Sequence, residues 1–266
     1  MKTSSNKPIG VFDSGVGGLT VVRSLRKYLP YEDIVYFGDT ARVPYGNKSR
    51  DTIRRFSREI IDFLIKNDVK AVIAACNTAS SLAVPAVKKE FGIPVVGVIE
   101  AGVEEAVNVS KNGRIGVIGT DSTISSSAYD RELKKVRSSW KLFSKSCPLF
   151  VPLVENRFLT DDVTYMVAER YLRHFRARKI DTLILGCTHY PLLKKVISDV
   201  LEGVKLVDSA TSVASTVKNI LENNGLDAAK KKNAKIKCFV SDDVKGFLRI
   251  ADIFLKENVT IKRAVL

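Results

Sequence analysis

The chain has 266 residues, of which 45% are hydrophobic and 27% charged, and its formal net charge is +14. This composition is typical of a globular protein with a buried core, and the length allows one large domain or two of ordinary size. No apolar run approaches the roughly 20 residues that cross a bilayer, and residues 1–7 hold no apolar signal region. We therefore expect a cytoplasmic protein that does not bind a membrane.

The basic charge is concentrated in residues 131–145, 170–179 and 230–237. These stretches alternate with apolar residues at helical spacing or lie in a predicted connection, which is typical of solvated helix faces and loops. No nucleic-acid-binding signature or platform of aromatic residues accompanies them. We expect no specific nucleic-acid partner despite the net charge of +14; only weak binding at low salt would follow from charge alone.

Strands and helices are predicted to alternate along the whole chain. Helical periodicity is clearest over residues 50–66, where Ile53, Phe56, Ile60 and Leu64 share one face. Such βαβ alternation predicts an α/β fold with parallel sheets flanked by helices. The predicted strands, in chain order, are Ile9–Phe12, Ile34–Phe37, Ala71–Ala74, Val95–Val98, Ile115–Ile118, Leu149–Val151, Thr182–Leu185, Lys205–Val207 and Ile236–Val240.

The chain contains an internal repeat. Residues 69–78 and 180–189 both run from an apolar strand through a small residue to a cysteine followed by polar residues. The predicted strands near residues 9 and 115, and near 95 and 205, repeat at a similar spacing. The repeat predicts two pseudo-symmetric α/β domains with the active site in the cleft between them. We expect residues 1–100 and 212–266 in the first domain and residues 101–211 in the second.

Candidate site residues follow the predicted strands, where ligands of parallel sheets bind. Asp13, Asp39, Cys76, Cys187 and His189 all stand just past a strand end. The segment at residues 13–18 is glycine-rich and suits close approach to an anion, but it lacks the third glycine of the dinucleotide fingerprint.

The two repeated cysteines, Cys76 and Cys187, are the strongest indication of a chemical function in the sequence. A single free cysteine is often a small buried hydrophobe, but duplication at equivalent strand ends favours a chemical role. Their polar neighbours Asn77, Thr78 and Thr188 can bind a carboxylate or ammonium group, and His189 can exchange a proton near neutral pH. A zinc site built from the two cysteines and His189 is an alternative, although the usual paired metal spacing is missing. The other cysteines, Cys147 and Cys238, are given no role.

Four motifs together resemble the cofactor-independent, two-cysteine amino-acid racemases, and among these the glutamate racemases. The resemblance covers essentially the full length of the chain. It rests on residues 13–20 (DSGVGGLT), 38–46 (GDTARVPYG), 76–80 (CNTAS) and 185–192 (LGCTHYPL).

The resemblance implies that the protein interconverts L- and D-glutamate by two-base proton transfer at Cα and supplies D-glutamate for peptidoglycan biosynthesis. Neither a cofactor nor a metal would be needed. Related aspartate racemases resemble this arrangement with Glu at the position of His189, so the histidine favours glutamate. The implied catalytic residues are Cys76, Cys187, Asp13, His189 and Glu155. The implied substrate contacts are Asp13, Ser14, Tyr45, Gly46, Asn77, Thr78, Thr120, Thr188 and His189.

Two other functions remain open on the sequence. The first is racemisation of aspartate or a related acidic amino acid. The second is a two-lobed protein that binds an acidic ligand without turning it over, although binding alone requires no thiol. We also expect a homodimer, because symmetric dimers are the commonest oligomers.

Overall fold

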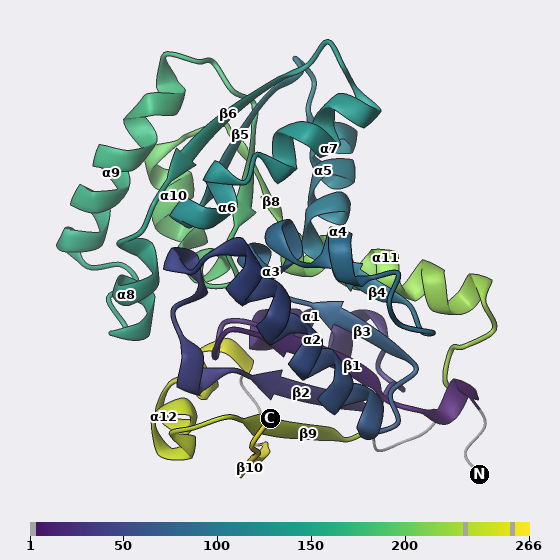
Figure 1. Cartoon of the computed structure of the whole chain (residues 1–266). Coiled ribbons are helices and arrows are strands. Elements are labelled where there is room, and N and C mark those ends of the chain that lie inside the picture. The colour runs from purple at the N-terminus through teal and green to yellow at the C-terminus, as the bar shows by residue number, and fades with distance from the viewer. Residues whose placement is uncertain (1–3, 231–233, 256–258) are drawn as a thin grey trace.

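The computed structural model describes residues 4–230, 234–255 and 259–266, which form two parallel sheets flanked by helices (Figure 1). The first sheet has the strand order β10-β9-β2-β1-β3-β4 and the second has the order β6-β5-β7-β8. Among the described residues, all the strand pairs of the two sheets are parallel. The strands of the first sheet are β1 (Ile9–Asp13), β2 (Ile34–Gly38), β3 (Ala71–Ala74), β4 (Val95–Gly97), β9 (Ile236–Val240) and β10 (Thr260–Arg263); those of the second are β5 (Arg114–Gly119), β6 (Lys141–Ser146), β7 (Thr182–Gly186) and β8 (Lys205–Asp208).

The strand orders reproduce the internal repeat. The run β2-β1-β3-β4 in the first sheet matches β6-β5-β7-β8 in the second, so that β3 and β7, which precede the two repeated cysteines, occupy equivalent positions. The first sheet is extended beyond β2 by β9 and β10 from the end of the chain. The α/β fold class predicted from the alternation of strands and helices is confirmed.

The helices are α1 (Leu19–Tyr28), α2 (Arg50–Lys66), α3 (Asn77–Leu82), α4 (Val84–Val87), α5 (Val98–Val109), α6 (Asp121–Ser125), α7 (Ala128–Val136), α8 (Phe150–Glu155), α9 (Asp162–Arg176), α10 (Lys194–Val200), α11 (Ser209–Asn223) and α12 (Val244–Leu255), with short 3-10 turns at Ser4–Asn6, Thr40–Arg42, Tyr45–Asn47 and Tyr190–Leu193. Helix α11 packs against both α1 and α5, and α5 also contacts β7 of the second sheet. The expected domain boundaries fall inside α5 and α11, which link the two sheets; the division into two domains stays a proposal.

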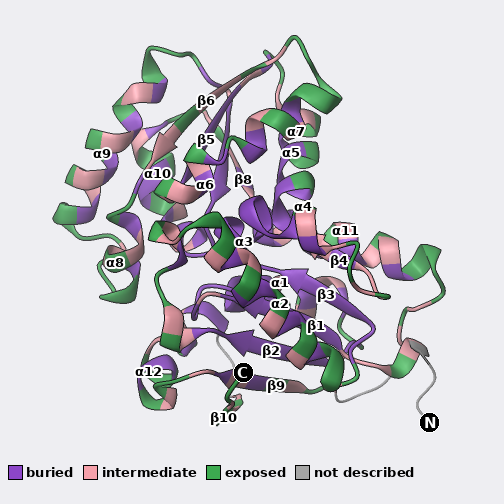
Figure 2. Ribbon diagram, in the orientation of Figure 1, coloured by how far each residue is buried: buried purple, intermediate pink, exposed green. Residues whose placement is uncertain are grey.

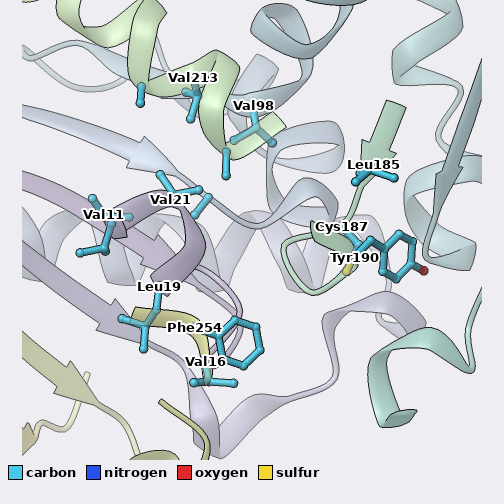
Figure 3. Packing of buried hydrophobic residues seen from close by; sticks show 14 of the residues in the cluster. Val11, Val16, Leu19, Val21, Val98, Leu185, Cys187, Tyr190, Val213 and Phe254 are labelled. Carbon is cyan, nitrogen blue, oxygen red and sulfur yellow. The ribbon is translucent and has the colours of Figure 1, made fainter. Parts of the chain in front are cut away.

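One apolar core runs from the first sheet into the second. Figure 2 shows that the inner strands β1, β2, β3 and β7 are buried while the outer helix faces are exposed. The core joins Val11 of β1, Val213 of α11 and Leu185 of β7, and it includes Cys187 beside Tyr190 (Figure 3). Because burying a Val or Leu side chain contributes about 1.5–3 kcal/mol, this shared core holds the carboxyl ends of the two sheets in a fixed relation.

The strand predicted at Leu149–Val151 is wrong. Those residues lead into α8, and the strand of this repeat is instead β6 at Lys141–Ser146. β6 is the edge strand of its sheet and none of its residues is fully buried, so it lacks the continuous apolar run that indicated the other strands. Strand β10 was also not predicted. Within the described part of the chain, no helix is long and apolar enough to cross a membrane.

Candidate active site

A cavity of about 460 Å³ lies where the carboxyl ends of the two sheets meet. It is lined by Ser14, Gly15, Val43, Pro44, Tyr45, Gly46, Asn47, Cys76, Asn77, Thr78, Thr120, Asp121, Pro148, Val151, Pro152, Glu155, Gly186, Cys187, Thr188 and His189. The candidate site residues line this cavity except Asp13 and Asp39, which lie fully buried behind the wall. The cavity has the size of small-molecule sites.

The first cysteine, Cys76, sits at the turn from β3 into α3 and is almost completely buried. Its Sγ lies 3.8 Å from Ser14 Oγ. Burial, together with the nearby Asp13 carboxyl, raises the pKa of the Cys76 thiol to about 12. Burial also raises the pKa of Asp13, against the opposing effects of His189 and of backbone N–H groups such as that of Gly15. Cys76 is therefore a protonated thiol near neutral pH.

The second cysteine, Cys187, follows β7 and is part of a chain of proton-carrying groups. His189 Nδ1 lies 3.9 Å from Cys187 Sγ, and His189 Nε2 lies 3.0 Å from Glu155 Oε1 at the end of α8. Burial lowers the pKa of His189, but the hydrogen bonds to Cys187 and Glu155 outweigh this effect and raise the pKa to about 10. His189 is therefore an imidazolium near neutral pH.

The two cysteines thus have opposite electrostatic surroundings. Cys76 lies near the Asp13 carboxyl group, which disfavours a negative charge on its sulfur, whereas Cys187 Sγ lies 3.9 Å from Nδ1 of the His189 imidazolium. Two thiols on a shared cavity, one beside a carboxyl group and the other beside an imidazolium, can accept a proton from a ligand and donate another to it.

The glycine-rich turn between β1 and α1 reaches the loop of the second cysteine. A Cβ added to Gly17 would lie 2.3 Å from Thr188 Oγ1 and 2.6 Å from His189 Nδ1. The Thr20 hydroxyl at the start of α1 donates to the Thr188 carbonyl oxygen over 3.2 Å. Glycine is needed at position 17 because two site residues from the other sheet fill the space where a side chain would be.

Neutral hydrogen-bond donors line the wall beside Cys76. The hydroxyls of Thr78, Thr120 and Thr123 lie within 3.0–3.2 Å of one another. The Asn77 side chain is 2% exposed, and its Nδ2 has no hydrogen-bond partner among the described residues. No lysine or arginine is among the described residues that line the cavity. Neutral donors and the His189 imidazolium are therefore the groups available to an anionic ligand.

A buried carboxylate holds the loop that carries Tyr45 and Gly46. Asp39, fully buried at the end of β2, accepts hydrogen bonds from Tyr45 Oη and from Arg42 Nε, the latter over 2.7 Å. At the other side of the loop, Ser122 Oγ donates to the Gly46 carbonyl oxygen over 2.5 Å. Asp39 was predicted only as a carboxylate at a strand end; its contacts place it behind the cavity wall as a support for Tyr45.

The remaining two cysteines lie outside the cavity lining. Cys147 and Cys238 are both buried, and Cys147 Sγ lies 3.7 Å from the Lys145 carbonyl oxygen. In the part of the chain that the structure describes, no group of three His, Cys, Asp or Glu side chains is arranged to hold a metal ion. The zinc site considered from the sequence therefore has no geometric support.

Sequence reasoning missed several lining residues. Val43, Pro44, Asn47 and Gly186 adjoin residues that were proposed, so their places in the chain were a usable signal. Pro148, Val151 and Pro152 belong to the start of α8 and the residues before it, a segment that includes the strand predicted at Leu149–Val151. Because this segment was expected to be part of a sheet, nothing in the sequence indicated that these three side chains line the cavity.

Comparisons with known proteins agree on one family. The model of the Asp/Glu/Hydantoin racemase family matches residues 9–217. A glutamate racemase from Geobacter metallireducens is 49% identical over 250 residues, which are 94% of this chain and 93% of the relative. The crystal structure of a glutamate racemase isoform from Bacillus anthracis matches with a TM-score of 0.95 and 38% identity over 98% of both chains. That of the Francisella tularensis enzyme in complex with D-glutamate matches with a TM-score of 0.91 and 41% identity, again over 98% of both. The chain belongs to the Asp/Glu/Hydantoin racemase family.

Proposed function

We propose that this protein is a glutamate racemase that interconverts L- and D-glutamate by proton transfer at Cα. The observation that carries the proposal is the pair of buried thiols, Cys76 and Cys187, on equivalent strand ends of one cavity. Racemisation removes a proton from one face of a carbon and returns one to the other. A single base would have to cross the plane of the substrate, whereas two thiols on opposite walls need not move.

The proposed cycle starts with Cys76 as the thiol and Cys187 as the thiolate. With L-glutamate bound, the Cys187 thiolate takes the Cα proton, forming an S–H bond as the C–H bond breaks. The Cys76 thiol gives its proton to the other face, which forms D-glutamate and leaves a thiolate on Cys76. The reverse reaction starts from that state, with Cys76 as the base for D-glutamate.

The groups behind each thiol would assist its proton transfers. Asp13, whose pKa burial raises, is placed to exchange a proton at the Cys76 side. His189 and Glu155 would serve Cys187 through their 3.0 Å contact.

The site must also stabilise the carbanion, because the Cα proton of an amino acid is far less acidic than a thiol. Donors fixed in advance around the substrate carboxylate are the most effective means of doing so. The Asn77 amide and the hydroxyls of Thr78, Thr120 and Thr188, which line the cavity, would be these donors. The loop of Tyr45 and Gly46, together with Ser14 on the opposite side, would exclude water.

Glutamate is favoured over aspartate by two observations. His189, with Glu155, places an imidazolium beside Cys187, and the sequence resemblance gives aspartate racemases a Glu at this position. The relatives at 45–52% identity carry the name glutamate racemase. The two-lobed binding protein is less well supported, because binding an acidic ligand needs no pair of thiols.

Several further proposals follow from this function. The two thiols supply both proton transfers, so the reaction needs no cofactor. The product would serve peptidoglycan biosynthesis in the cytoplasm, and the enzyme would form a homodimer. Residues 1–100 with 212–266, and residues 101–211, would form the two domains on either side of the site.

The test is to follow the optical activity of L-glutamate and of L-aspartate separately with purified enzyme. We expect L-glutamate to lose its rotation and L-aspartate to keep it over the same period. Faster turnover of aspartate would overturn the substrate assignment. Tight binding of glutamate without loss of rotation, in protein shown to be folded and reduced, would favour the binding protein instead.

A further inference from the structure

Tyr129 makes a contact that the proposed mechanism does not use. It lies in α7, which packs near α3 and α5 (Figure 1). Its side chain is buried, and its hydroxyl donates to Asn77 Oδ1 over 2.6 Å. Asn77 directly follows Cys76, so a tyrosine from the second half of the repeat reaches the first cysteine loop.

In the structure the Asn77 amide accepts from Tyr129 through Oδ1, which leaves its NH₂ group facing away from the tyrosine. Rotation of the amide by 180° would exchange its oxygen, which accepts, for its NH₂ group, which donates. Because the Tyr129 hydroxyl donates to Oδ1, the Nδ2 donor is directed elsewhere, and it is buried without a partner among the described residues. A buried donor without a partner is costly, and Asn77 lines the cavity, so a bound carboxylate would relieve the cost.

The ring of Tyr129 touches the other cysteine loop. A Cβ added to Gly186, the residue before Cys187, would lie 3.2 Å from Tyr129 Cε2. The ring therefore packs against the backbone at the end of β7, and it also lies near Gly102 of α5. One side chain thus contacts the residue before Cys187 with its ring and the residue after Cys76 with its hydroxyl.

We propose that Tyr129 is a positioning residue of the racemase: it directs the Asn77 NH₂ group toward the substrate carboxylate and sets the relation between the two cysteine loops. Burial raises the pKa of Tyr129, so its hydroxyl stays a donor at every pH at which the enzyme works. The inference rests on the proposed function for its substrate, but the contacts that carry it are independent of the reaction.

The experiment is a double-mutant cycle with Tyr129→Phe and Asn77→Ala. Tyr129→Phe removes the hydroxyl and leaves the ring in place. The Asn77 amide can then rotate, so its NH₂ group faces the substrate only part of the time. We expect kcat/KM for L-glutamate to fall about tenfold in Tyr129→Phe, the scale of one buried hydrogen bond. In the Asn77→Ala background the same change should alter kcat/KM less than twofold, because its target is gone. Tyr171→Phe, which removes a hydroxyl bound to Leu149 N outside the cavity, is the matched control.

Affinity for D-glutamate, measured by calorimetry, provides a readout that needs no turnover. Tyr129→Phe should bind more weakly than the wild type, with no further loss in the Asn77→Ala background. Equal effects in both backgrounds would mean that Tyr129 only stabilises the fold and would overturn the inference, as would wild-type values in a folded Tyr129→Phe.

Asn77→Asp offers a second test that leaves Tyr129 unchanged. It keeps an acceptor for the Tyr129 hydroxyl but loses the NH₂ donor, so it should bind D-glutamate far more weakly; unchanged binding would overturn the inference. If the wild type binds D-glutamate but does not racemise it, the proposed function fails, and the binding cycle still decides the role of Tyr129.

Discussion

Gly17→Ala tests whether the β1–α1 turn sets the position of the second cysteine loop. The added methyl would lie 2.3 Å from Thr188 Oγ1 and 2.6 Å from His189 Nδ1, whereas ordinary contacts begin at 3.4 Å. The two residues are 5% and 6% exposed and can yield only toward the cavity that they line, so we expect the loop to shift by about 1 Å. Gly17 is not among the residues with positive φ, so alanine adds no backbone strain and the effect is steric.

A displacement of this size at reacting groups costs about 100-fold in rate, equivalent to about 2.7 kcal/mol. We therefore expect kcat/KM for L-glutamate to fall by about that factor in Gly17→Ala. Overpacking should lower the free energy of unfolding by about 1–3 kcal/mol, measured by urea denaturation. Gly92→Ala is the control, since an added Cβ there meets nothing within 4 Å. A folded Gly17→Ala enzyme with wild-type kcat/KM would refute the steric argument.

Three further predictions concern groups around the site and away from it. Cys147→Ala and Cys238→Ala should each keep wild-type activity, because neither side chain lines the cavity; a folded but inactive variant of either would count against the assignment of the thiols. The pKa of His189 is about 10 in the folded protein against 6.5 for the ordinary side chain. The stabilisation that protonated His189 contributes is therefore fully present below about pH 6.5 and is lost as the pH rises through about 10. The loss is up to about 1.4 kcal/mol per pH unit. Across this range the free energy of unfolding should fall more steeply in the wild type than in a variant lacking His189. Lys70→Met would leave the Glu32 carboxylate buried without its 2.6 Å ion pair and should cost about 3–5 kcal/mol of stability, so an unchanged melting temperature would contradict that reading.

The fold could be predicted from the sequence where strands are buried on both faces. β1, β3 and β7 are fully buried, so each stands out as a continuous apolar run. Edge strands carry no such signal: β6 has polar, partly exposed residues and was misplaced, and β10 was not predicted.

The candidate site was predictable to the extent that it is local in sequence. Cys76 and Cys187 stand directly after parallel strands, and the carboxyl ends of such strands mark ligand sites. The contact of Gly17 with Thr188 and that of Tyr129 with Asn77 join distant segments, so only the packing of the two sheets reveals them.

The most direct test of the two-thiol mechanism is the early-time reaction of L-glutamate in D₂O, with deuterium at Cα measured separately in substrate and product. Because Cys76 exchanges its proton with solvent before delivering it, D-glutamate formed at early times should carry deuterium while the remaining L-glutamate does not. Cys76→Ala should form no D-glutamate. Early product that retains the hydrogen of the substrate would mean that one base serves both faces, and it would contradict the mechanism.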